Sequence, residues 1–530
     1  MPQHAFPRQS SKLTHWRPHR RFVVGGAAAA LFSGRLVSGG RADAAQAGTP
    51  PALADGLTID LAVEPPTLDP ALAYEIDAWS VVHSIYDSLL QFGANGEMEP
   101  LLAESFSLLD PLTYEIDLRQ GIAFHNGEPF DARSVSFTLA HILNPETGSQ
   151  VAQNFSVIEN VEEVDDHTVR FHLAAPAPWL PSQIAPWMAM LPPEYAADSA
   201  NDFASNPVGT GPFRFIDWER GQRINLERNP DYFADSAKGH AIAQSASFRF
   251  VGEASTRVAD LLSGSVDLIR DVPADQIAMI EQAGSEVVAF PISGSAWVRV
   301  PTDVEPFSDA RVRQALNHAV DIEGIVEALL AGHGERLASL FVPGGLGYDP
   351  DLAPFPYDPE RARQLLAEAG YPDGFATTID YASTEAADLV TAIAGQLSEV
   401  GIRTDARPVE LATFNATWTD QAAAPLRFLT WRPLFDPYTL LSLVVSSGGF
   451  LSRYSNDTAR ELIEQGAVET DPEARAGIYR ELGRALYDEP AAIYGFDLVA
   501  FYGVGSETPP WTPRADDYIL PTYRREDGAE

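Results

Sequence analysis

The sequence of 530 residues contains no cysteine. The chain therefore cannot form disulfides, thiolate zinc sites or a cysteine nucleophile, and it has no cysteine to carry a lipid. Lysine is almost as rare, because Lys12 and Lys238 are the only two. With 36 basic and 74 acidic residues the formal net charge is -38, which repels nucleic acids and anionic membrane surfaces. Nucleic acid is therefore not an expected partner.

Familiar catalytic motifs are missing as well. The eleven histidines form no His-Glu-x-x-His pair, and no Gly-x-Ser-x-Gly turn occurs. The segment Gly209-Thr210-Gly211 precedes an expected strand and no lysine follows it, so a turn is favoured over a phosphate-binding loop. The sequence thus indicates no catalytic residue, metal ligand or cofactor, and we expect a protein that is not an enzyme.

The N-terminal residues have the order of an export signal. Basic residues without any acid precede an apolar run over 22–32, and small residues follow at 42–47. This order is typical of a secretory signal peptide, and the run is shorter than the about 20 residues of a membrane span. Arg20-Arg21 is similar to a twin-arginine signal, with an ordinary Sec signal as the alternative. We expect residues 1–47 to be removed by cleavage near Ala44–Gly48.

The rest of the chain alternates between strand and helix patterns. Alternating apolar residues predict strands at 57–63, 113–118, 168–173, 223–226 and 248–251. In the second half, Asp358-Pro359 and Asp471-Pro472 provide the N-cap and first residues of two helices. Strands at 377–381 and 402–406 with a helix at 385–400 between them predict a parallel unit. These patterns indicate an α/β fold.

Several short segments of the sequence, taken in their order along the chain, form one pattern. They are Pro70–Leu90, Leu112–Phe130, Asn206–Phe213, Glu227–Tyr232, Arg311–Asn317, Tyr357–Glu360, Ala369–Gly374 and Tyr454–Asn456. In this order the blocks resemble the extracellular solute-binding proteins of family 5 of ABC importers, the dipeptide, oligopeptide and nickel-binding type. The resemblance covers about residues 57–505.

The resemblance implies an α/β, periplasmic-binding-protein-like fold of two lobes, with an extra subdomain in the first lobe. After the signal peptide (1–47), the implied divisions are a linker at 48–56, a first lobe at 57–90, 205–295 and 505–530, the extra subdomain at 91–204 and a second lobe at 296–504. Such a protein captures a small solute and delivers it to the permease subunits of an ABC transporter in the inner membrane. Without a lipidated cysteine, we expect it to be a soluble monomer in the periplasm.

The resemblance also implies where the solute binds. In peptide-binding members a Trp of the second lobe starts a motif whose Asp, three residues on, pairs with the α-ammonium of the ligand. Trp431 matches that Trp, but Leu434 occupies the Asp position, and counting back from Asp436-Pro437 leaves the segment one residue short. The ligand-binding candidates are Tyr74, Trp79, Trp297, Trp431, Arg432, Leu434 and Asp436.

Each candidate has a structural alternative. The aromatic residues could belong to the core, Arg432 could be a solvated surface arginine, and Asp436 could cap a helix that begins near Pro437. Because Leu434 cannot pair with a buried ammonium, we expect no general binding of peptides with a free amino terminus. Arg432, if it faces the solute, suits a carboxylate or phosphate.

The expected function is that of a periplasmic receptor for a peptide-like or other organic solute. Two alternatives remain. One is a receptor of the same family for an opine, an oligosaccharide or a metal chelate, and the other is an exported hydrolase of unknown chemistry.

Overall fold

The computed structural model describes residues 53–73, 75–93, 96–385, 387–418, 425–432, 436–446, 449 and 451–524. The predicted signal peptide and two of the ligand-binding candidates, Tyr74 and Leu434, lie outside the described residues. Within these residues, no helix has both the length and the apolar character that a membrane crossing requires.

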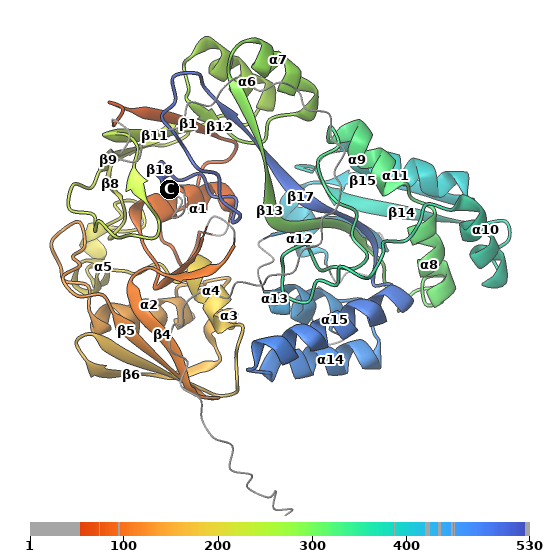
Figure 1. Ribbon diagram of the computed structural model, residues 1–530, viewed down its shortest axis with the longest axis horizontal. Coiled ribbons are helices and arrows are strands. Elements are labelled where there is room, and N and C mark those ends of the chain that lie inside the picture. Colours follow the sequence, from red (N-terminus) through yellow and green to blue (C-terminus); the bar gives the residue numbers. More distant parts are fainter. Residues whose placement is uncertain are drawn as a thin grey trace, which may run out of the picture. The chain divides into compact units, whose positions relative to one another are not determined.

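A ten-stranded mixed sheet runs through the described chain (Figure 1). From edge to edge its strands are β15 (Ile402–Val409), β14 (Phe375–Ala382), β16 (Leu426–Trp431), β13 (Glu286–Arg299), β17 (Ala492–Val504), β12 (Leu268–Ile269), β1 (Leu57–Leu61), β11 (Ser245–Phe250), β9 (Arg223–Arg228) and β8 (Phe213–Glu219). The long antiparallel strands β13 and β17 connect the two halves. We call the half with β1, β8, β9, β11 and β12 the first lobe, and the half with β14, β15 and β16 the second lobe.

Three smaller sheets are also present among the described residues. They are β4 (Ala103–Asp110), β5 (Thr113–Leu118), β7 (Thr168–Leu173) and β6 (Ile158–Asp165) in one sheet, β2 (Leu90–Phe92) with β3 (Met98–Pro100), and β10 (His240–Ala241) with β18 (Thr522–Tyr523). The four-stranded sheet shares the hydrophobic core of the first lobe. Because β18 pairs with β10, the C-terminal segment returns to the first lobe after β17.

Helices surround both halves of the large sheet. The first lobe has α1 (Ile76–Ile85), α2 (Ala132–Leu143), α3 (Ala152–Phe155), α4 (Leu180–Trp187), α5 (Pro193–Ala197), α6 (Ala254–Ser263) and α7 (Ile277–Gln282). The second lobe has α8 (Ala310–His318), α9 (Ile322–Leu329), α10 (Pro359–Glu368), α11 (Ala387–Glu399), α12 (Leu411–Ala416), α13 (Tyr438–Leu440), α14 (Asp457–Val468) and α15 (Pro472–Asp488). Short turns of other helix types occur at Ser199–Asn201, Ala274–Gln276 and Leu441–Val445.

The second lobe has a core on each face of its sheet. Alternate residues of a strand point to opposite faces, so Ala296 and Val298 join the core beneath α8 to α11, whereas Trp297 joins the core beneath α12 to α15. The patterns read from the sequence are confirmed here, because β14 and β15 are parallel and α11 connects them.

Both predicted helix caps are confirmed. The Asp358 side chain accepts a hydrogen bond from the backbone N–H of Arg361 at 2.9 Å, and the Asp471 side chain accepts one from Ala474 at 2.8 Å. In each helix a proline follows the cap, where its missing N–H costs nothing. Such caps each contribute about 1 kcal/mol and fix where α10 and α15 begin.

The Gly209–Gly211 segment is confirmed as a non-helical connection into β8. Its glycines are required by close packing against the end of α1. A side-chain carbon at Gly209 would lie 2.1 Å from the carbonyl oxygen of Ile85, and one at Gly211 would lie 2.6 Å from it. The segment therefore has a packing role.

A buried carboxyl group in β1 makes the first lobe sensitive to pH. The side chain of Asp60 is fully buried, and Arg249 Nε lies 3.1 Å from its Oδ1. Arg249 is shared with Asp260 of α6. Burial raises the pKa of Asp60 to about 6, and the opposing effect of Arg249 does not cancel the effect of burial. The folded state therefore holds a proton on Asp60 more tightly than the unfolded chain does.

We predict that the contribution of Asp60 to the free energy of unfolding falls by up to about 3 kcal/mol as the pH rises from about 4 to about 6. A raised carboxyl pKa stabilises the fold below the unfolded value, and this contribution is lost as the pH passes the folded value. Asp60→Asn should remove this part of the pH dependence in urea titrations, whereas the exposed control Glu104→Gln should keep it. An unchanged pH profile in Asp60→Asn would contradict the assignment.

Candidate functional site

The carboxyl ends of parallel strands from both lobes face one another. In the first lobe β12 runs parallel to β1, and Arg270-Asp271 follow directly after it. In the second lobe β16 runs parallel to β14, and the residues just beyond these strands include Arg432 and Glu385. Ligands of open α/β sheets commonly bind beyond the carboxyl ends of strands. The two lobes meet here, because Arg432 Nε lies 3.3 Å from Asp517 Oδ2.

We call this group of charged residues the interlobe cluster. Its members are Glu75, Asp77, Arg270, Asp271, Glu385, Arg432 and Asp517. On the first-lobe side, Arg270 is nearly fully buried and lies 2.9 Å from Asp77 and 2.5 Å from Asp517. The hydroxyl of Tyr502 donates a 2.6 Å hydrogen bond to Asp517. This half of the cluster is therefore held rigidly by first-lobe residues.

The second-lobe half of the cluster is more open. The Arg432 side chain is 33% exposed, and the Glu385 carboxylate accepts a hydrogen bond from the Thr430 hydroxyl at 2.8 Å. Gly294 of β13 packs directly beneath, because a side-chain carbon there would lie 2.9 Å from Arg432 Cβ. Arg432 thus lies directly after β16 and against Gly294 of β13, with part of its side chain exposed.

The interlobe cluster has more acidic than basic groups. Burial raises the pKa of Glu75, Asp77 and Glu385, and the cluster has five carboxyl groups against two guanidinium groups. Asp271 differs, since burial alone would raise its pKa, but Arg270 and then Arg432 bring it below the usual value. The surplus of carboxyl groups makes the site more favourable to a neutral or cationic ligand group than to an anion.

The lobes also meet at a second place. The rings of Trp179, before α4, and Tyr438 of α13 stack with centroids 4.4 Å apart. Beside them, Thr439 Oγ1 donates to Gln183 Oε1 at 3.2 Å. These contacts connect the part of the first lobe that contains the four-stranded sheet to the second lobe. The two contact places are built from segments far apart in the sequence.

Asp436 is bound by a second-lobe arginine. Arg475 of α15 lies 2.5 Å from one carboxylate oxygen of Asp436 and 3.0 Å from the other. The second of these oxygens also accepts a 2.9 Å hydrogen bond from the backbone N–H of Tyr438, the first residue of α13. The structure thus supports the helix-capping interpretation of Asp436, because both of its oxygens already have donors.

The predicted tryptophans occupy different environments. Trp79 is 3% exposed, donates from Nε1 to the Ala73 carbonyl at 2.9 Å and contacts Tyr518 edge-on. Trp297 is 2% exposed and lies in the core beneath α12 to α15. Trp431 is only partly buried and directly precedes Arg432. Trp431 packs against the same core beneath α12 to α15, whereas the neighbouring Arg432 forms an ion pair with Asp517 of the other lobe.

A comparison with known protein families matches most of this chain. The family described as bacterial extracellular solute-binding proteins, family 5 Middle, matches residues 97–452. The chain belongs to this family. Membership places it among binding proteins of ABC importers rather than among enzymes, and it confirms the two-lobed α/β fold.

Family 5 relatives bind different solutes. The glutathione-binding protein GsiB of Salmonella paratyphi A is 31% identical over 342 residues, which are 64% of this chain and 66% of the relative's length. Heme-binding protein A of Haemophilus influenzae is 28% identical over 495 residues, 85% of this chain and 87% of that protein. The chain thus spans about two thirds of the first relative and most of the second.

Solved family structures confirm the fold. AgaA from A. tumefaciens R10, in complex with agropinic acid, has a TM-score of 0.72 and 26% identity, covering 85% of this chain and 93% of its own. DppA from Helicobacter pylori, in complex with the peptide STSA, has a TM-score of 0.76 and 23% identity, covering 89% and 97%. At this identity the likeness to DppA establishes the fold alone.

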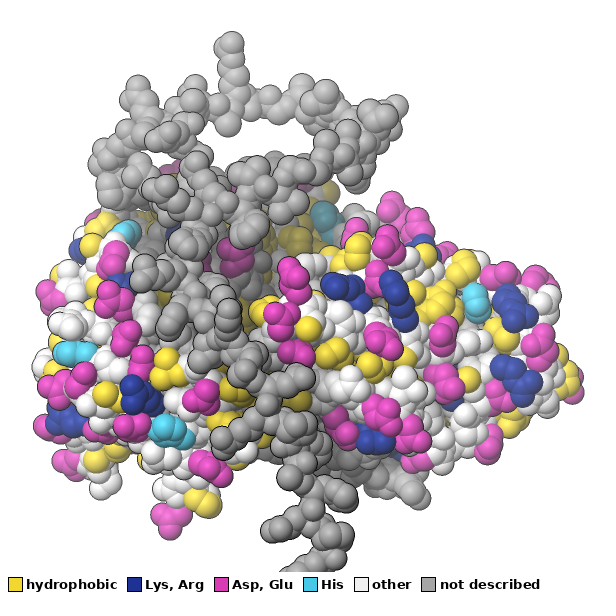
Figure 2. Space-filling view, turned by 60° about the horizontal axis from the view of Figure 1, so that its bottom comes forward, with side chains coloured by type: hydrophobic (Ala, Val, Ile, Leu, Met, Phe, Trp, Pro, Cys, Tyr) yellow, Lys and Arg dark blue, Asp and Glu magenta, His cyan; other side chains and the backbone are white. Residues whose placement is uncertain are grey.

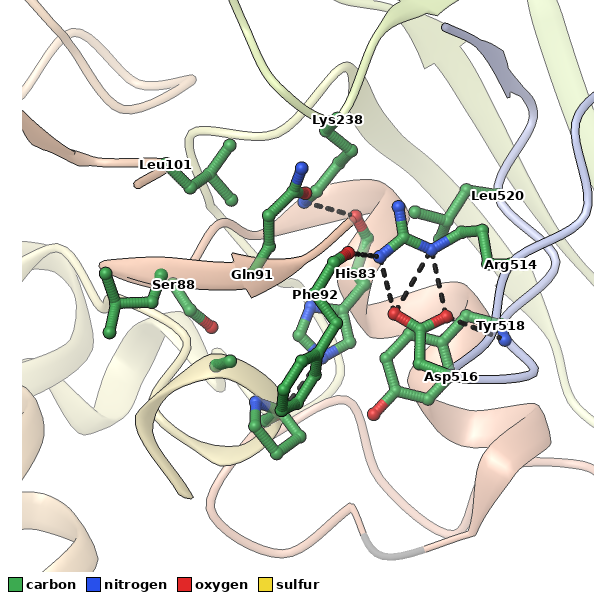
Figure 3. A pocket seen from close by; sticks show the side chains of 13 residues that line it. His83, Ser88, Gln91, Phe92, Leu101, Lys238, Arg514, Asp516, Tyr518 and Leu520 are labelled. Carbon is green, nitrogen blue, oxygen red and sulfur yellow. Dashed lines mark hydrogen bonds and ion pairs between the residues drawn. The ribbon is translucent and has the colours of Figure 1, made fainter. Parts of the chain in front are cut away.

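A small cavity inside the first lobe is distinct from the interlobe cluster. Figure 3 shows Lys238, Gln91 and the Arg514–Asp516 ion pair around it. The cavity has room for about one water molecule, which is too little for an organic solute. Lys238 Nζ lies 2.5 Å from Asp87 Oδ1 and donates hydrogen bonds to two backbone carbonyls. Because these contacts occupy the ammonium group, this site has a structural role.

A hollow of about 600 Å³ beside Glu286, Val504 and Trp511 lies apart from the residues of the interlobe cluster. In Figure 2 acidic side chains are spread over both lobes of the visible face, interspersed with arginines. Sequence reasoning named Arg432 as a candidate and missed the other members of the interlobe cluster, among them Arg270, Asp517 and Glu385. The one available signal was the Arg270-Asp271 pair directly after the apolar Leu268-Ile269, a pattern that the many acidic residues of the chain obscured.

Proposed function

We propose that this protein is a periplasmic receptor that captures a small organic solute between its two lobes and delivers it to the permeases of an ABC importer. The observation that carries the proposal is the interlobe cluster, in which Arg432 of the second lobe reaches Asp517 of the first. A family 5 chain with charged residues at facing strand ends has the arrangement that capture between lobes requires.

The proposal includes the division of the chain and its partners. The first lobe comprises 57–90, 205–295 and 505–530, with an extra subdomain at 91–204, and the second lobe comprises 296–504. The partners are a solute and inner-membrane permease subunits, and the receptor works as a monomer. The four-stranded sheet at 103–173 and the return of the C-terminal segment to β10 support this division.

The charge of the interlobe cluster narrows the choice of solute. The expectation of an anionic solute assumed a free Arg432, whereas Arg432 faces Asp517 and the charges of Glu75, Asp271 and Glu385. An anionic group would have to displace Asp517 from the guanidinium. We therefore propose a solute that brings a neutral or positively charged group to this cluster, within a family whose relatives are named for glutathione and heme.

Binding should bring the lobes together by bending β13 and β17. Their register breaks between Pro291–Val499 and Ser295–Asp497, so Ile292, Ser293 and Gly294 stand opposite Leu498 alone. A bulge of this kind weakens pairing locally and allows a bend.

We predict that solution scattering shows a smaller radius of gyration at saturating solute than without it. The physical reason is that the contacts of Arg432 with Asp517 and of Trp179 with Tyr438 can persist only while the lobes are together. An unchanged radius at saturation would indicate a preformed site and contradict capture by closure.

Export by the twin-arginine route is a further part of the proposal. We predict that Arg20→Lys together with Arg21→Lys blocks export, because the twin-arginine route needs the arginine pair itself. The readout is the amount of protein in the periplasmic fraction, with Arg35→Lys as the matched control. Normal export of the double variant would show that a Sec signal operates.

A further inference from the structure

The second lobe buries three arginines near one another. Arg299 of β13 and Arg427 of β16 are cross-strand partners, so their side chains stand on the same face of the sheet. Arg453 follows Leu451, whose carbonyl accepts a hydrogen bond from Arg299 at 3.3 Å. The exposed fractions are 2% for Arg299, 0% for Arg427 and 9% for Arg453. We call these residues the arginine cluster.

Neutral groups satisfy part of the arginine cluster. Arg427 donates to the carbonyls of Thr417 at 2.7 Å and Phe414 at 2.6 Å, at the carboxyl end of α12. Arg299 donates to the Trp418 carbonyl at 3.1 Å. The guanidinium of Arg427 also lies 3.9 Å from the ring centroid of Phe414 and 4.8 Å from that of Trp418. These contacts orient the arginines without supplying a full negative charge.

The negative charge near the arginine cluster is insufficient. Among the described residues, Asp303 is the one carboxylate within ion-pair distance, 3.0 Å from Arg453, and its side chain is 48% exposed. Asp380 of β14, the cross-strand partner of Arg427, is a second nearby carboxylate, but it is already paired with Arg407 at 2.8 Å. Three arginines therefore face two carboxylates, of which one is half-exposed and the other is shared. The Nε groups of Arg299 and Arg427 are buried and have no hydrogen-bond partner in the described part of the chain. Burial, together with the charges of Arg427 and Arg453, lowers the pKa of Arg299 to about 9. A buried charge without a partner is strongly unfavourable.

We propose that the arginine cluster holds a small inorganic anion, of the size of chloride or phosphate, inside the second lobe. Such an anion would accept hydrogen bonds from the Nε groups of Arg299 and Arg427. Its negative charge would offset the excess positive charge of the cluster. Guanidinium groups suit this task because they stay charged and present several donors in a fixed plane. The site is separate from solute capture, since β16 has Arg427 near its start and Arg432 just beyond its end.

The anion should stabilise the folded protein. The thermal midpoint of the full mature protein is measured in sodium chloride, sodium phosphate and sodium gluconate at equal ionic strength. We expect the midpoint to rise with the logarithm of chloride or phosphate concentration above that in gluconate, a bulkier organic anion that serves as the reference. Arg299→Met should lose this rise. The control Arg361→Met, whose side chain is 42% exposed, should keep it.

Crystals soaked in bromide provide a second readout on the unaltered protein. An anomalous peak beside Arg299 and Arg427 would support a halide site, whereas a midpoint rise in phosphate without a bromide peak would support an oxyanion. No peak and no difference from gluconate would overturn the proposal.

Discussion

Lys238→Met should lower the free energy of unfolding by about 3–5 kcal/mol, as expected when one member of a buried ion pair is removed. Lys238 and Asp87 are both buried, and Lys238 Nζ lies 2.5 Å from Asp87 Oδ1. Without the ammonium, the side-chain donors to Asp87 among the described residues are the hydroxyls of Thr210 and Tyr232. The measurement is a urea titration of the purified protein at neutral pH.

Two further variants separate charge from packing in this measurement. The double change Lys238→Met with Asp87→Leu removes both charges and should recover part of the lost stability. Arg361→Met, which removes an exposed positive charge, should change it by less than about 1 kcal/mol. Equal losses in the single and double variants would show that packing, and not the unpaired carboxylate, sets the effect.

Asp436→Asn should also destabilise the protein by about 3–5 kcal/mol, while leaving solute affinity unchanged. The change removes the carboxylate that pairs with Arg475, whose side chain is only 6% exposed. Because both oxygens of Asp436 have donors within the second lobe, we do not expect the residue to bind the ammonium of a peptide. Urea titration measures the first effect, and titration calorimetry measures the second.

The matched variant for Asp436→Asn is Glu385→Gln in the interlobe cluster. A glutamine at position 385 can still accept the hydrogen bond from the Thr430 hydroxyl, so the free energy of unfolding should change little. The affinity for a solute with a cationic group should fall at least tenfold, because the negative charge is lost. Micromolar peptide binding that disappears in Asp436→Asn would contradict the structural role of Asp436.

Local features of the sequence were sufficient to predict much of the fold. Asp358 and Asp471 mark helix starts because the cap and its N–H partner are three residues apart, and the strand at 113–118 follows from its alternating pattern. The family resemblance supplied the two-lobed arrangement, which no local pattern specifies.

The interlobe cluster could not be predicted in the same way because its contacts are distant in sequence. Arg270 binds Asp77, 193 residues away, and Asp517, 247 residues away. In a chain with 74 acidic residues, no spacing rule distinguishes these two from the rest. Lys238 illustrates the same limit, since its rarity in the sequence gave no indication of its buried pairing with Asp87.

Native mass spectrometry of the protein purified from its own periplasm tests the central claim most directly. A receptor of this family should carry one equivalent of a small organic molecule, released unchanged on denaturation and bound again by the refolded protein. The bound mass should disappear in a variant of the interlobe cluster such as Glu385→Gln. Conversion of the released molecule into a product on incubation with the protein, or retention of the same mass by Glu385→Gln, would contradict solute capture at this site.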